Sequence, residues 1–168
     1  MVFNYNFDPR INNQIPDLVD LVKARVADES LSCEQVVWDT EMKFYDYIWE
    51  DVLSGKEKAT FRAVKTNPLQ LRLPAARVLP VIITKEDDPK YRQQWGTIEL
   101  TQVWFGKLET FPKTAARYNN AKSYREFLGG ALCGYCELGG MQHLASMYFL
   151  GAKNIGKTVE VSKPRDVF

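Results

Sequence analysis

The sequence predicts a compact α+β domain spanning residues 1–168, built on a mainly antiparallel sheet of four to five strands. Three observations support this class. Apolar residues recur at helical spacing in two N-terminal segments, about 15–28 and 33–54. Between residues 59 and 105 the chain becomes rich in β-branched and aromatic residues, and prolines interrupt it. Helical spacing then returns at about residue 123, in a long glycine-containing segment near the C-terminus.

The N-terminal elements follow from alternation and capping. Phe3, Tyr5 and Phe7 alternate with polar residues, which predicts a strand over 2–7. Apolar residues at intervals of three and four predict a helix over 15–28. Ser32 stands three residues before Gln35, as in a capping box, and Gly55 is a typical helix end, so we expect a second helix over 33–54.

The remaining elements rest on a change of period. Residues 60–65, 78–84 and 97–105 favour strands, and a short segment at 158–162 favours a last strand. From about Ser123 to Phe149 an apolar stripe predicts one long helix that faces the sheet. Glycine is unfavourable inside helices, so either another backbone packs closely on this helix or it breaks at Gly139-Gly140.

Composition sets limits on the class of protein. The 168 residues are 45% hydrophobic and 26% charged, which excludes a disordered chain, a collagen-like fibre and a membrane protein. Polar residues interrupt the best apolar run before it reaches the length of a membrane span. The N-terminus lacks the pattern of a signal peptide, and three cysteines fit a reducing compartment. We therefore expect a soluble, cytoplasmic protein.

Two short motifs lie in the glycine-rich segment. Cys133-Gly-Tyr-Cys136 resembles the active-site frame of thioredoxins and glutaredoxins over four residues. In that family the first cysteine begins a helix, whereas the spacing here places Cys133 inside one. Residues 151–158 match the P-loop pattern of nucleotide hydrolases, but the ten residues that follow offer no helix to receive phosphates. We interpret the cysteines as packing residues and Gly151 as a helix C-cap.

A metal site would have to combine residues that are far apart. Cys33, Cys133, Cys136 and His143 have the right number of ligands for zinc. On a straight helix, however, His143 lies roughly 10 Å along the axis from Cys136, at ~1.5 Å per residue. These residues remain weak candidates for a metal- or thiol-dependent enzyme, and we expect no bound cofactor.

The charges are segregated along the sequence. Residues 1–57 contain twelve acids and five bases, whereas residues 58–85 contain six bases and no acid. The basic block includes Arg62, Arg72 and Arg77 and could meet nucleic-acid phosphates, although it carries no recognised binding signature. The alternative is that oppositely charged blocks fold against each other.

Without a coherent catalytic set, the sequence favours a non-enzymatic interaction or regulatory protein. Another protein is the first expectation for its partner, nucleic acid is the second, and self-association stays open. Tryptophan and arginine dominate binding hot spots. The candidate contact residues are therefore Trp38, Trp49, Arg62, Arg72 and Trp104.

Overall fold

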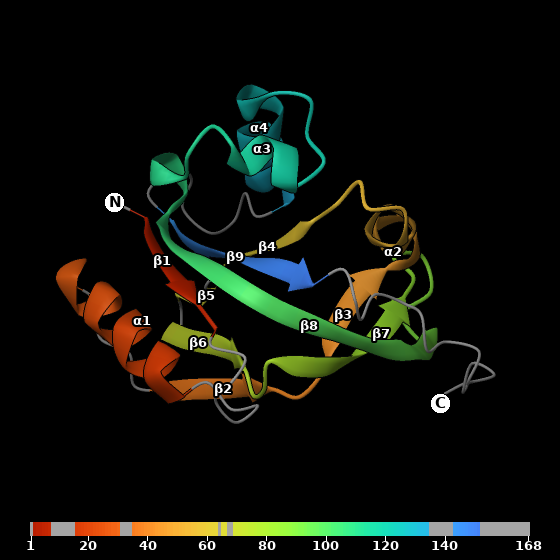
Figure 1. Ribbon diagram of the computed structural model, residues 1–168, viewed down its shortest axis with the longest axis horizontal. Coiled ribbons are helices and arrows are strands. Elements are labelled where there is room, and N and C mark those ends of the chain that lie inside the picture. Colours follow the sequence, from red (N-terminus) through yellow and green to blue (C-terminus); the bar gives the residue numbers. More distant parts are fainter. Residues whose placement is uncertain are drawn as a thin grey trace.

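The computed structural model describes residues 2–7, 16–30, 35–63, 65–66, 69–134 and 143–151. They form an α+β fold in which a curled sheet carries helices on both sides (Figure 1). This is the class that the sequence predicts, but the predicted number of four to five strands is too low, because the described residues form a main sheet of six strands and a second sheet of three. None of the helices within the described ranges is long and apolar enough to cross a membrane.

The main sheet has six strands in the order β3-β7-β8-β9-β4, with β1 paired to β8. β3 and β7 run parallel, and the other neighbours run antiparallel. A smaller sheet has the order β2-β6-β5. The strands of the main sheet are β1 Phe3–Asn6, β3 Met42–Tyr45, β4 Ala59–Ala63, β7 Val78–Thr84, β8 Arg92–Lys107 and β9 Leu144–Gly151. Those of the smaller sheet are β2 Gln35–Asp39, β5 Lys65–Thr66 and β6 Leu69–Pro74.

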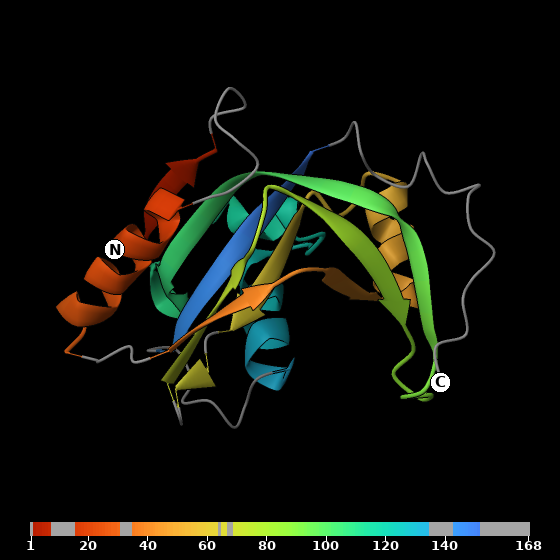
Figure 2. The ribbon, with the colours of Figure 1, turned by 90° about the horizontal axis from the view of Figure 1, so that it is seen from below.

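Strand β8 gives the main sheet its curl. It is 16 residues long, and its register shifts once against β7, between Pro80 and Ile82, and once against β9, between Leu100 and Gln102. Both shifts place an extra residue in β8. Gly96, at the first of them, has a φ of 51°, a conformation that favours glycine. Bulges increase strand twist, so β8 bends strongly along its length (Figure 2).

Strand β9 separates two hydrophobic cores. Leu144 and Tyr148 enter the core covered by helix α1 (Pro16–Asp28), whereas Ala145 and Met147 enter the core covered by helix α4 (Tyr124–Gly134). Seven of the eight β9 residues are buried. A strand buried on both faces reads as one apolar run rather than as an alternation.

This burial corrects the prediction of one long C-terminal helix. Helix α4 begins at Tyr124, close to the expected start, but it ends at Gly134. The following described segment, Leu144–Gly151, is a strand. Gly151 is therefore a strand residue and not a helix C-cap, and an added Cβ would lie 3.2 Å from the Cβ of Glu99 on β8. Gly139-Gly140 lie outside the described residues.

The predicted helix over 33–54 is also mostly wrong. Residues 35–39 and 42–45 form strands β2 and β3, and helix α2 covers only Asp46–Leu53. In β3, Met42 and Phe44 are buried while Lys43 and Tyr45 are exposed, the alternation of a half-buried strand. Ser32, the proposed capping residue, lies outside the described residues.

The other predicted elements are confirmed where the structure describes them. A strand begins the chain, helix α1 matches the expected helix over 15–28, and β7 has the expected bounds of 78–84. β4 and β8 cover the two remaining strand predictions, and β8 is longer than expected. The proposed strand at 158–162 lies outside the described residues.

Candidate functional site

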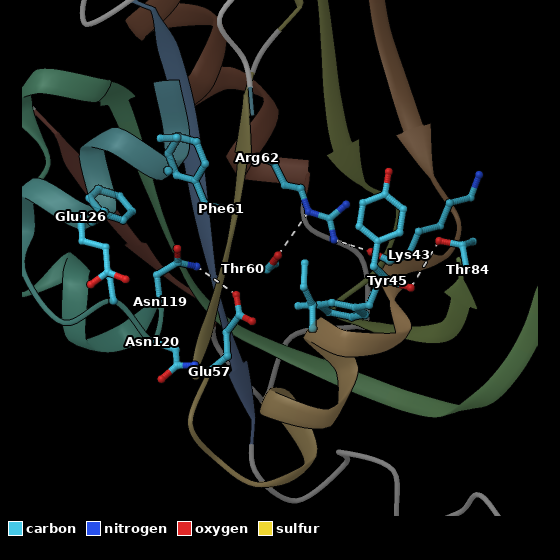
Figure 3. Close-up of a pocket in the computed structure, with 16 residues that line it drawn as sticks. Lys43, Tyr45, Glu57, Thr60, Phe61, Arg62, Thr84, Asn119, Asn120 and Glu126 are labelled. Atoms are coloured by element: carbon cyan, nitrogen blue, oxygen red, sulfur yellow. Dashed lines mark hydrogen bonds between the residues drawn. The ribbon is translucent and has the colours of Figure 1, made fainter. Parts of the chain in front are cut away.

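The two end strands of the main sheet, β3 and β4, approach each other because the sheet is curled. No strand ladder joins them; the side chain of Arg62, on β4, bridges the gap instead. Its Nη2 donates a hydrogen bond to the backbone oxygen of Lys43 on β3, at 2.6 Å. Its Nε donates to Thr60 Oγ1 at 3.3 Å, and the guanidinium lies over the ring of Phe44, 5.5 Å from the centroid. Figure 3 shows this bridge.

Two pockets meet at the Arg62 bridge, and both are lined by Lys43 and Arg62. We call the first, of about 600 Å³, the Glu57 pocket; it lies toward α2 and α4. We call the second, of about 470 Å³, the Trp38 pocket; it lies toward β2 and β6. Both volumes fall in the range of small-molecule sites, roughly 300–1,000 Å³.

Glu57 is a buried carboxyl group that lines the first pocket, with only 9% of the residue exposed. Its Oε1 accepts a hydrogen bond from Asn119 Nδ2 at 3.0 Å, and the same amide donates to the backbone oxygen of Ala59 at 3.1 Å. Burial, and to a lesser extent the charge of Asp51, raise the pKa of Glu57 to about 8, although Arg62 acts in the opposite direction. At neutral pH the group is therefore mostly protonated and can donate as well as accept.

The chain reverses beside Glu57 in a turn that carries two amide side chains. Helix α3 (Ala115–Tyr118) ends there, and Lys58 N donates to the backbone oxygen of Tyr118 at 2.8 Å. Asn120 has a φ of 54°, which asparagine tolerates better than most residues. Its Nδ2 donates to Asp51 Oδ2 at 3.2 Å. These contacts place the amides of Asn119 and Asn120 with Glu57 at one side of the pocket (Figure 3).

Aromatic side chains line other parts of the Glu57 pocket. Phe61 makes edge-on contacts with Phe111 and Phe127, with centroid distances of 6.0 and 5.6 Å. Tyr45, 40% exposed, stacks on Tyr47 with an interplanar angle of 18°. The contacts of Phe61 with two buried rings hold its position, so the pocket combines a preformed apolar surface with a small set of hydrogen-bonding groups.

Lys43 supplies an accessible positive charge where the two pockets meet. Its side chain is 57% exposed, and its nearest carboxylate, Glu41, lies 3.7 Å away. Arg92 contacts both oxygens of that carboxylate, so Glu41 is mainly engaged elsewhere. This pairing lowers the pKa of Glu41, chiefly through the hydrogen bonds from Arg92.

Several described cations of the basic block 58–85 are engaged with other side chains of the fold. Arg72 pairs with Asp39 at 2.6 Å, Arg77 pairs with Glu99 at 3.6 Å, and Lys85 lies over the ring of Tyr91. Blocks that are segregated in sequence therefore do form ion pairs with one another in the fold. Among the cations of the block whose side chains the structure describes, Arg62 is the one that lines both pockets.

The Trp38 pocket has a different character. Trp38 projects from β2 and is 46% exposed. The ion pair of Arg72 and Asp39 also lines this pocket, together with the buried residues Ser146 and Tyr148 of β9. Burial raises the pKa of the Tyr148 hydroxyl to about 12, so this group stays protonated.

The five contact residues predicted from the sequence do not share one surface. Trp38, Arg62 and Arg72 all line the Trp38 pocket. Trp49 is only 3% exposed and packs on Phe44 at a centroid distance of 5.5 Å, so its ring belongs to the core. Trp104 is half-buried among aromatic rings, 4.9 Å from Phe149 and 5.9 Å from Tyr118.

Most of the candidate metal and thiol residues lie outside the residues that the structure describes. Cys136 and Cys33 are not among the described residues, and of Cys133 only the backbone, near the end of α4, is described. His143 is buried, and its backbone oxygen accepts a hydrogen bond from Leu108 N at 2.9 Å. Within the described ranges, no three histidine, cysteine or acidic side chains gather in a way that could hold a metal ion. The P-loop match extends beyond the last described residue, Gly151.

Several pocket residues gave little signal in the sequence. Glu57 follows Gly55 in a polar stretch and resembles a solvated charge, and Asn119-Asn120 resembles an ordinary turn. The two asparagines are distant from Glu57 in the sequence. They join the same site because helix α3 ends beside β4. A pair of adjacent asparagines before a capping serine, Ser123, was the one available local hint.

Comparisons with known proteins give a weak likeness at the level of structure. No protein-family model matches the sequence, and no curated protein matches it. A protein of Enterococcus faecalis V583 from the DUF984 family is 16% identical, with a TM-score of 0.46 over 83% of this chain and 94% of its own. The ASCH protein of Zymomonas mobilis is also 16% identical, with a TM-score of 0.39 over 79% of this chain and 83% of its own. Likenesses this weak carry no inference about function.

Proposed function

We propose that the protein binds single-stranded nucleic acid and receives an unstacked base in the Glu57 pocket. The observation that carries the proposal is the convergence of three kinds of group in one cavity: a buried carboxyl beside two amides, aromatic rings, and the cations Lys43 and Arg62. A nucleotide has three matching parts, which are a hydrogen-bonding base edge, a flat apolar face and a phosphate.

The polar groups suit a base edge in particular. Base edges combine donors and acceptors within one plane, and proteins read them with amide and carboxyl side chains. Asn119 and Asn120 supply amides, and the neutral Glu57 supplies a carboxyl that can donate. A buried ionised carboxylate would repel the acceptors of a base and cost more to bury, so the raised pKa of Glu57 favours this ligand class.

The depth of the site favours single strands over duplex. Glu57 and Thr60 are 9% and 5% exposed, so a base must leave its stack to reach them. Unstacking costs a few kcal/mol in a duplex and least in a strand that is already single. Aromatic side chains such as Phe61 and Tyr45 then offer surfaces on which a splayed base can pack.

Few cations line the pockets, so the phosphates of a nucleic-acid strand should contribute little to the binding affinity. Lys43 and Arg62 lie where the pockets meet, while Arg72 and Arg77 are engaged in ion pairs. We therefore expect one or two phosphate contacts, rather than the extended contact that the full 58–85 block would make. Most of the affinity then comes from the base in its pocket.

The direct test is a titration of labelled single-stranded RNA and DNA of mixed sequence, followed by fluorescence anisotropy, with the same strands annealed to their complements as comparison. We expect single strands to bind at least tenfold more tightly than duplexes. Lys43→Ala should weaken binding of single strands about tenfold, the equivalent of ~1.4 kcal/mol for a charge-assisted contact.

The matched control is Lys23→Ala, which removes the same charge from the exposed face of α1. Arg62 bonds to the backbone oxygen of Lys43, so truncating the Lys43 side chain leaves the bridge acceptor in place. An equal loss of affinity in both variants would show that Lys43 acts only through the net charge of the protein. Absence of binding to every strand would reject the proposal and return the interaction-protein interpretation to first place.

A further inference from the structure

The Trp38 pocket is adjacent to the Glu57 pocket, and the two share a boundary. Lys43 and Arg62 line both, and the bond from Arg62 Nη2 to the backbone oxygen of Lys43 runs across the gap between β3 and β4. A ligand that occupied both pockets would therefore have to pass the charges of these two side chains.

The chemistry of the Trp38 pocket differs from that of its neighbour. Several of its polar side chains are already engaged within the protein, because Arg72 pairs with Asp39 at 2.6 Å and Ser146 Oγ donates to the backbone oxygen of Arg62 at 3.4 Å. The prominent accessible surface is the indole of Trp38, which is 46% exposed. A flat aromatic face beside polar groups that already have partners is better suited to stacking with a base than to forming hydrogen bonds with the edge of a base.

We propose that the Trp38 pocket holds the neighbouring nucleotide of the same strand, with its base stacked on Trp38 and the connecting phosphate at Lys43 and Arg62. The ligand of the whole site is then a dinucleotide step, read by hydrogen bonds in one pocket and by stacking in the other. This inference rests on the proposed function and deepens it, since the Glu57 pocket alone would accept a mononucleotide.

Three features of the boundary support the phosphate position. Lys43 is 57% exposed, and its nearest carboxylate, on Glu41, is held mainly by Arg92. Arg62 is fixed by bonds to β3 and β4, so its charge is positioned before a ligand arrives. A preformed pair of cations between two base-sized cavities matches the order base, phosphate, base along a strand.

The test compares mononucleotides with dinucleotides by isothermal titration calorimetry on the full chain. The probes are the four ribonucleoside 5′-monophosphates and the dinucleoside monophosphates ApA, CpC, GpG and UpU. We expect the best dinucleotide to bind more tightly than the best mononucleotide. Trp38→Ala should remove that advantage, a loss of about 5- to 150-fold for one stacked base, and leave mononucleotide binding unchanged.

Trp38→Phe is the matched variant, because it keeps an aromatic face and should retain most of the advantage. Tryptophan fluorescence gives an independent reading: dinucleotides should quench the wild type more than Trp38→Phe, and mononucleotides should quench both equally. Dinucleotides that bind no better than mononucleotides, or a Trp38→Ala variant that weakens both equally, would overturn the second subsite and leave the proposed function standing. Failure of both probe classes to bind would remove the proposed function, and the second subsite with it.

Discussion

The strands of the main sheet meet in two contrasting ways. On one side β8 and β9 pair along their length, and alternate β9 residues fill two hydrophobic cores. On the other side β3 and β4 are joined by the Arg62 side chain, and polar residues line the pockets around it. We expect the paired side to contribute most of the free energy of unfolding, whereas the open side carries polar and charged side chains that a ligand can reach. We propose that binding takes place on the open side, where no strand ladder joins β3 to β4.

The largest effect should come from the paired side. Phe105 on β8 is 1% exposed and contacts Phe3 at a centroid distance of 5.7 Å. Phe105→Ala should lower the free energy of unfolding by about 3–5 kcal/mol, because it leaves a cavity in the core. Urea denaturation measures this loss. Leu53→Ala, at a 44% exposed position on α2, is the control and should cost far less.

If Phe105→Ala costs no more than the exposed control, then the β8 and β9 side is not the stabilising half of the molecule, and the contrast between the two sides is lost. A folded Phe105→Ala variant should still bind oligonucleotides, since Phe105 lines neither the Glu57 pocket nor the Trp38 pocket.

The next effect belongs to the open side and depends on pH. The pKa of Glu57 is raised from 4.5 to about 8, mainly by burial. Between these values the unfolded state loses the proton while the folded state keeps it, so Glu57 makes the protein less stable as pH rises. Glu57→Gln removes this penalty and preserves the acceptor for Asn119. We expect the variant to match the wild type near pH 4.5 and to exceed it above pH 8 by on the order of 2–4 kcal/mol.

Unfolding curves at several pH values provide the measurement. Wild-type binding to single strands should also weaken as pH passes about 8, because the carboxyl loses its donor, whereas Glu57→Gln should show a flatter profile. An identical pH dependence of stability in both proteins would contradict the buried, neutral state of Glu57.

A smaller effect concerns the bridge itself. Arg62→Lys keeps a positive charge but cannot reproduce the fork that reaches both Thr60 and the backbone oxygen of Lys43. We expect about 1–2 kcal/mol of lost stability and roughly a tenfold loss of affinity for single strands. Arg117→Lys, at an exposed position on α3 that lines neither pocket, is the control and should have small effects on both. Full affinity in Arg62→Lys would show that the bridge does not organise the site.

The smallest effect is the response to salt. With one or two phosphates contacted, the slope of log K against log salt should be about −0.7 to −1.4 for single strands. Titrations between low and moderate salt measure it. A slope several times steeper would indicate that many cations of the 58–85 block contact the strand, which is the nucleic-acid alternative that the sequence leaves open.

The sequence predicts the α+β class and the elements with a clear period, such as helix α1 and strand β7. It fails where tertiary burial overrides local pattern. Seven of the eight β9 residues are buried because the strand faces two cores, and all of them except Ser146 are apolar; such a run fits a helix equally well. The segment of β2 and β3 contains two short strands in succession. Each is too short for its alternation of apolar and polar residues to be recognised among the neighbouring aromatic residues.

The site is less predictable than the fold for a related reason. Arg62 and Trp38 are residue types that often carry binding, and both line the pockets. Glu57 and Asn119 owe their role to a contact between residues 62 positions apart, which no local spacing encodes. Trp49 shows the converse, because a hot-spot residue type can equally be a core residue.

The most direct test of the central claim is a heteronuclear NMR titration of the full chain with a short single-stranded oligonucleotide. We expect the side-chain amide signals of Asn119 and Asn120 and the indole signal of Trp38 to shift together, while signals from α1 remain unchanged. Shifts that appear on α1, or strands that bind without moving the two asparagine amides, would contradict a nucleotide site in the gap between β3 and β4.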